Sequence, residues 1–153
     1  MGISENFIFS SKEVSSIDSL AINDENISGF LLMKRAAEFS FDLTLKKYPN
    51  TKSFLVFCGT GNNAGDGYLF ASHAIKKGLN ASVIYLASPE NLKGDALKAF
   101  ADLKSLGAKI VPWTKECKFE ADIIIDAVFG IGLNRVIEDD YLECIKAING
   151  NIK

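Results

Sequence analysis

The chain has 153 residues, of which 48% are hydrophobic and 24% charged, and its formal net charge is −2. These values are typical of one soluble globular domain, and the lack of a Lys/Arg cluster argues against a nucleic-acid partner. No apolar run approaches the ~18 residues of a membrane span, and the first residues do not resemble a signal peptide. Together with three widely spaced cysteines, these features predict a cytoplasmic protein that contacts no membrane.

The N-terminal part of the chain predicts two helices. Ser10 and Glu13 form a capping box that opens a helix ending near Ile22. The second helix is predicted from about Ser28 to Lys47. Its buried side is expected to contain Phe30, Leu31, Met33, Ala37, Phe41 and Leu45.

From residue 53 onward, strands and helices alternate. The predicted strands are Ser53–Cys58, Ala81–Ala87, Ala108–Pro112 and Asp122–Phe129. The predicted helices are Asp66–Lys77, a long helix that begins at Ser88-Pro89 and reaches Leu106, and Asp139–Asn149. This alternation predicts an α/β fold with a doubly wound parallel sheet, Rossmann-like with three αβα layers, carrying extra N-terminal helices. A helix that ends at Gly150 should return into another strand, so residues 1–153 are expected to form a single domain without its last strands and helices.

A glycine-rich loop follows the first predicted strand. Gly59–Ala64 satisfies the G-x-G-x-x-G/A pattern between a strand and a helix, where backbone amides can approach a phosphate. An ordinary NAD site also needs an acidic residue about 20 residues further on, and the segment Tyr85–Pro89 has none. Asn62, Asn63 and Asp66 add polar groups that can bind an anion or offer oxygen atoms to a cation. We therefore predict a ligand site that differs from a standard coenzyme site.

A second loop, Asp126–Arg135, follows the fourth predicted strand. In a doubly wound sheet the first and fourth strands are neighbours, so the two loops should face each other across one crevice. Arg135 would there be placed to bind a phosphate. Asp126 ends an apolar strand and has two interpretations: it caps backbone amides of its own loop, or it binds a cation together with Asn63. Oxygen-only ligation would suit a hard ion.

Three segments carry a resemblance to a known family. FCGTGNNAGDGYLFA, DAVFGIGLNR and GFLLMKRAA resemble motifs of the NAD(P)HX epimerases, the YjeF N-terminal domain family. One departure is Ala64, where the family has glycine. A second is that the family continues with a Val-Asp-hydrophobic-Pro-Ser-Gly segment, which supplies a substrate-binding aspartate and a further potassium contact and which this sequence does not contain.

The resemblance implies an isomerase of nicotinamide nucleotide repair that interconverts the R and S forms of hydrated NADH and NADPH. An ADP- or ATP-dependent dehydratase, separate or fused, would be its functional partner, and a homodimer is compatible with the family. Asn63 and Asp126 would ligate K⁺. The substrate-binding residues would be Asn62, Asn63, Ala64, Gly65, Asp66, Gly130, Ile131, Gly132, Leu133, Asn134, Arg135 and Val136.

Two alternatives accompany this hypothesis. The same domain serves as a non-catalytic binding or dimerisation domain in mRNA-decapping scaffold proteins, but the polar residues of both loops are present here. An ordinary Rossmann dehydrogenase is disfavoured by the missing ribose carboxylate. The sequence does not identify the catalytic acid or base: Asp66 and Asp126 are the available carboxylates, and Asp126 is expected to be committed to the ion.

Overall fold

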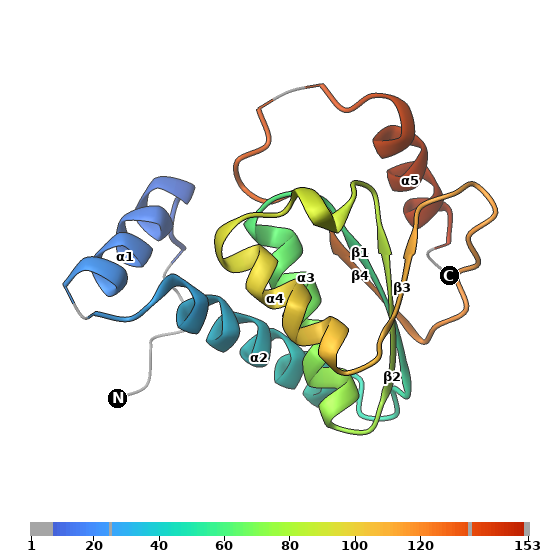
Figure 1. Ribbon diagram of the computed structural model, residues 1–153, viewed down its shortest axis with the longest axis horizontal. Helices are drawn as coiled ribbons and strands as arrows, with labels where there is room; N and C mark the ends of the chain where they lie inside the picture. The colour runs from blue at the N-terminus through green and yellow to red at the C-terminus, as the bar shows by residue number, and fades with distance from the viewer. Residues whose placement is uncertain (1–7, 25, 135, 152–153) are drawn as a thin grey trace.

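The computed structural model describes residues 8–24, 26–134 and 136–151, and it contains a four-stranded parallel sheet with helices on both faces (Figure 1). The strands are β1 (Ser53–Cys58), β2 (Asn80–Tyr85), β3 (Lys109–Pro112) and β4 (Ile123–Ala127). The helices are α1 (Ser11–Asn23), α2 (Gly29–Lys47), α3 (Asn62–Lys76), α4 (Gly94–Ser105) and α5 (Asp139–Gly150), with a short 3₁₀ helix, η1 (Pro89–Asn91). None of the helices in this described part is long and apolar enough to cross a membrane.

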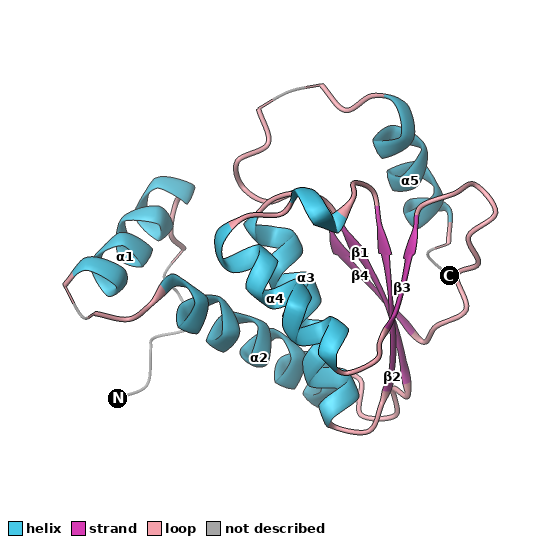
Figure 2. Cartoon of the chain, viewed as in Figure 1, coloured by secondary structure: helices cyan, strands magenta, loops and turns pink. Residues whose placement is uncertain are grey.

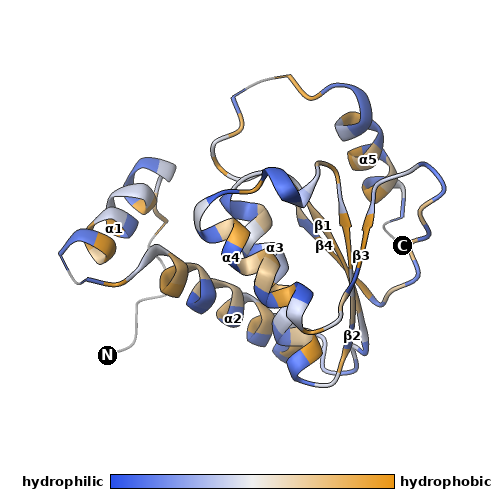
Figure 3. Ribbon diagram, in the orientation of Figure 1, coloured by the Kyte–Doolittle hydropathy of each residue, from blue (hydrophilic) through white to orange (hydrophobic). Residues whose placement is uncertain are grey.

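The strand order is β3-β2-β1-β4, which confirms that the first and fourth strands are neighbours. Helices α2, α3 and α4 lie on one face of the sheet and α5 on the other (Figure 2). Strand β1 is covered on both faces: Val56 packs in the cluster beneath α3, and Phe57 packs in the cluster beneath α5. The strands are coloured mainly as hydrophobic, and the helices carry both hydrophobic and hydrophilic residues (Figure 3). The predicted three-layer α/β fold is confirmed.

The structure corrects several predicted boundaries. The long helix after Ser88 is two elements, η1 and α4, because Leu92 and Lys93 between them are extended and Gly94, the first residue of α4, has a left-handed φ of 57°. Helix α3 begins at Asn62 instead of Asp66, so half of the glycine-rich motif forms its first turn. Leu31 is 40% exposed, although the α2 pattern predicts that it is buried.

Asp122 ties the start of β4 to the start of β1. Its Oδ2 accepts hydrogen bonds from the backbone N–H of Lys52 (2.8 Å) and from the backbone N–H (2.9 Å) and hydroxyl (3.0 Å) of Ser53. The hydroxyl of Ser53 in turn accepts from the Asp122 N–H at 3.0 Å. The bond from the Lys52 backbone, followed by those from Ser53, holds the pKa of Asp122 below its usual value.

We expect Asp122→Ala to lower the melting temperature at pH 7 by a few degrees, because three donors lose their acceptor. The stabilisation by Asp122 is present above its unfolded-state pKa of about 4 and is lost as the pH falls through the lower folded-state value. The gap between wild type and variant should therefore narrow in acid, as thermal melts at pH 7 and pH 3 would show. Glu120→Ala removes an exposed carboxylate nearby and is the control; an equal effect of both substitutions at both pH values would contradict this prediction.

Candidate functional site

A cavity of about 880 Å³ lies at the carboxyl ends of β1 and β4. Its walls are residues 60–63 and Asp66 from the β1–α3 segment, residues 128–134 after β4, and Ser15 and Asp18 from α1. The two loops that the sequence analysis singled out therefore share one cavity, as predicted from the strand order.

Close backbone packing sets the distance between the two loops. The Gly59 N–H donates to the Ala127 carbonyl at 3.2 Å, and a Cβ atom at Gly59 would overlap the carbonyl oxygen of Val128. Gly61 is different, because a Cβ atom there would meet nothing within 4 Å. Only the first of these two glycines is needed for the approach of the loops.

Asn63 joins the first turn of α3 to the opposite loop. Its Nδ2 donates to the Phe129 carbonyl at 2.8 Å, and a Cβ at Gly130 would lie 3.3 Å from the Cβ of Asn63. No described residue donates a hydrogen bond to its Oδ1, which leaves that oxygen available to a ligand or cation. Asn63 is thus both a structural tie and a candidate ligand.

The first turn of α3 offers an anion site. Gly61 is the N-cap, and no side chain among the described residues accepts a hydrogen bond from the first N–H groups of the helix. Helix N-termini with free N–H groups favour negatively charged groups such as phosphates. This turn lies in the cavity wall, where Asn62 and Asn63 are lining residues.

Asp66 is a half-buried carboxyl group in the same wall. Burial raises the pKa of Asp66 to about 6, and the negative charge of Asp18 on α1 contributes in the same direction. A carboxyl group with such a pKa exchanges its proton close to neutral pH, as a general acid or base requires.

Asp126 is not one of the described residues that line this cavity. Its side chain is exposed, and its Oδ1 accepts from the Val128 N–H at 2.9 Å, which agrees with the capping interpretation. In register it pairs with Phe57, whose side chain packs on the α5 side of the sheet. Burial raises the pKa of Cys144 on α5 to about 12, and the charge of Asp126 adds to this effect.

The other predicted site residues fall into four groups. Asn62, Asp66 and residues 130–134 line the cavity together with Asn63. Ala64 and Gly65 are buried in α3, where Gly65 lies against Met33 and Ala96, and Val136 lines a separate hollow near the start of α5. Arg135 lies outside the described residues. Among the described residues, no group of three or more His, Cys, Asp or Glu side chains could hold a metal ion.

Six lining residues were not predicted: Ser15, Asp18, Thr60, Gly61, Val128 and Phe129. Val128 and Phe129 belong to the second predicted loop, Asp126–Arg135. Thr60 and Gly61 belong to the glycine-rich motif and could have been included on that ground. Ser15 and Asp18 come from a helix far away in the sequence, and nothing in their local pattern indicates a site.

The model of the family described as "YjeF-related protein N-terminus" matches residues 30–153, and the chain therefore belongs to this family. It is 32% identical over 142 residues to the "Bifunctional NAD(P)H-hydrate repair enzyme Nnr" of Coxiella burnetii, covering 93% of this chain and 29% of that protein. It is 31% identical over 145 residues to the "NAD(P)H-hydrate epimerase" of Limosilactobacillus reuteri, covering 93% of this chain and 67% of that protein. The crystal structure of yeast YNL200c has the same fold, with a TM-score of 0.77 at 20% identity, over 93% of this chain and 64% of that one.

Proposed function

We propose that this chain interconverts the R and S forms of hydrated NADH and NADPH. The observation that carries the proposal is the cavity shared by residues 60–63, Asp66 and residues 128–134, in a family whose relatives include proteins named NAD(P)H-hydrate epimerase. The chain spans less than a third of the bifunctional relative and about two thirds of the epimerase relative.

Different residues of the cavity suit the pyrophosphate and the reacting half of such a substrate. The N–H groups at the start of α3 suit the pyrophosphate, because they supply donors and the positive end of the helix dipole. Asp66 suits the reacting half, because epimerising a ring carbinol carbon requires proton transfer at the ring or its hydroxyl group. We assign the role of general acid or base to Asp66, since its pKa lies near 6.

We further propose that K⁺ is held by Asn63 and Asp126. Their donor atoms fit a hard cation: Asn63 has a free amide oxygen, and Asp126 has an exposed carboxylate with one oxygen engaged by Val128. The ion would place a positive charge at the edge of a cavity whose described residues include no Lys or Arg.

Potassium should therefore stimulate the reaction. We expect replacement of K⁺ by choline at constant ionic strength to slow epimerisation, and Asp126→Asn to raise the K⁺ concentration needed for half-maximal rate. Asn can still accept from the Val128 N–H, so this variant removes the charge and keeps the cap. Rates that are the same in K⁺ and choline would refute the potassium site and leave the epimerase proposal standing.

The relatives named bifunctional repair enzymes support a dehydratase as functional partner, separate or in the same polypeptide. The three free cysteines of the described residues, two of them buried, are consistent with a cytoplasmic protein. The formation of a homodimer by this chain remains a prediction.

A coupled assay tests the proposed function. A dehydratase specific for the S form, supplied with a mixture of both epimers of NADHX, should restore part of the NADH quickly and the rest slowly. Adding this chain should convert the slow phase into a fast one. The absorbance of NADH measures both phases. An unchanged slow phase would argue against epimerisation by this chain.

A further inference from the structure

Helix α1 forms one wall of the cavity although it is hardly packed against the rest of the protein. None of its side chains is buried, and Val14 and Ile17 are 38% and 48% exposed. Figure 1 shows it at the edge of the molecule, beside the N-terminal end of α2. Ser15 and Asp18, one helical turn apart, nevertheless line the same cavity as Asn62 and Asp66.

Asp18 and Asp66 present two carboxyl groups to this cavity from two different helices. They are close enough for the charge of Asp18 to act on Asp66. No Lys or Arg is found among the described residues that line the cavity, so nothing described there neutralises the pair. Two neighbouring carboxylates repel phosphate groups and accept hydrogen bonds from neutral donors.

We propose that Asp18 is a substrate-binding residue that, together with Asp66, accepts hydrogen bonds from the hydroxyl and amide groups of the hydrated nicotinamide riboside. The inference rests on the proposed function, in which Asp66 serves the reacting half of the substrate. The pyrophosphate then lies at the N-terminus of α3, away from the two carboxyl groups, and the substrate can bind in one direction only. Helix α1 thereby contributes to specificity as well as to the wall.

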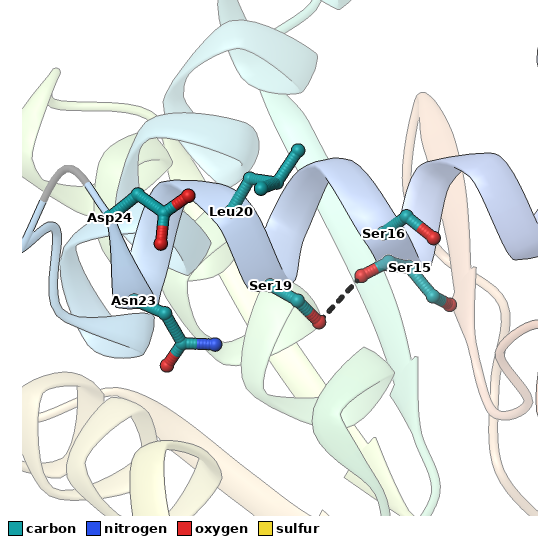
Figure 4. A pocket seen from close by; sticks show the side chains of 6 residues that line it. All are labelled: Ser15, Ser16, Ser19, Leu20, Asn23 and Asp24. Carbon is teal, nitrogen blue, oxygen red and sulfur yellow. Dashed lines mark hydrogen bonds between the residues drawn. The ribbon is translucent and has the colours of Figure 1, made fainter.

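The same helix provides a matched control. A shallow hollow beside α1 is lined by residues of this helix, among them Asn23, and by its C-cap Asp24 (Figure 4). In this view the Ser19 hydroxyl donates to the Ser15 carbonyl, at 2.8 Å. Asp24 is exposed and does not line the site cavity. Asp24→Asn therefore changes the charge of α1 as Asp18→Asn does, outside the proposed contact.

The experiment compares both variants with the wild-type chain. Steady-state rates on R-NADHX give kcat and KM, and competition by inorganic pyrophosphate reports on the phosphate side of the cavity. We expect Asp18→Asn to lower kcat/KM by about tenfold to a hundredfold, mainly through KM, as for loss of a charge-assisted hydrogen bond. Pyrophosphate should bind the variant as well as or better than the wild type, and Asp24→Asn should stay within about twofold.

The outcomes separate the two proposals. A wild-type chain that neither epimerises nor binds the hydrate contradicts the proposed function, and the inference fails with it. An active wild type with an unaffected Asp18→Asn contradicts the inference alone. If Asp18→Asn weakens hydrate binding and pyrophosphate binding equally, the substitution disturbs the cavity as a whole, and this result would also overturn the inference. If circular dichroism shows that Asp18→Asn loses helix, Asp18→Ser is tested in its place, because serine is already common in this helix.

Discussion

Asp66→Asn is expected to reduce kcat for epimerisation of NADHX by about a hundredfold or more, the usual contribution of a positioned general acid or base. The substitution keeps the size of the side chain and removes its titratable proton. Asp42→Asn on the exposed side of α2 is the control and should leave kcat unchanged. The wild-type rate should also change around pH 6, where the carboxyl group titrates, and this change should be absent in the variant.

The stability of the same variant separates catalysis from folding. The folded-state pKa of Asp66, about 6, lies above the unfolded value. The free energy of unfolding therefore decreases as the pH rises from about 4 to 6, because the charged carboxylate is less favourable in the folded protein than in the unfolded chain. Asp66→Asn should therefore melt at a higher temperature than the wild type at pH 7, and this advantage should disappear near pH 3. A variant that is both inactive and less stable at pH 7 would instead indicate a structural role for Asp66.

Gly59→Ala is expected to destabilise the fold by about 3 kcal/mol, at the upper end for overpacking, because its methyl group would overlap the Val128 carbonyl oxygen. The backbone of residue 59 fixes the position of the methyl group, and the Val128 oxygen is itself a backbone atom, so neither can rotate away. Urea denaturation followed by circular dichroism measures the loss. Gly61→Ala lies in the same motif, meets nothing within 4 Å and should stay within about 0.5 kcal/mol of the wild type. Equal effects at both positions would show that the contact with Val128 is not what requires glycine.

The sequence predicted those parts of the fold that depend on local patterns. The continuous apolar run Ser53–Cys58 identified a strand covered on both faces, and the Ser10–Glu13 pair identified the start of α1. The break at Gly94 was missed because a glycine within a helical pattern is tolerated often enough that its left-handed φ cannot be inferred. The start of α3 was placed too late because its N-cap, Gly61, lacks the polar side chain that marks most helix starts.

The site was predicted as far as the strand order determines it. Neighbouring β1 and β4 bring their loops together, so the sequence alone assigns Asn63 and residues 130–134 to one cavity. The position of the Asp126 carboxylate was harder to predict. The side to which it points depends on the alternation of side chains along β4 and on the turn that the carboxylate caps. Asp18 could not be predicted, because only the path of the chain between α1 and α2 brings it to the cavity.

The most direct test of the central claim uses purified R-NADHX and chromatographic separation of the two epimers. With this chain and K⁺ present, we predict that the mixture approaches the equilibrium ratio of R and S much faster than the spontaneous reaction, and that Asp66→Asn loses most of this acceleration. Interconversion no faster than the spontaneous rate, by a folded chain in the presence of K⁺, would contradict the assignment of epimerase activity and leave a domain that only binds.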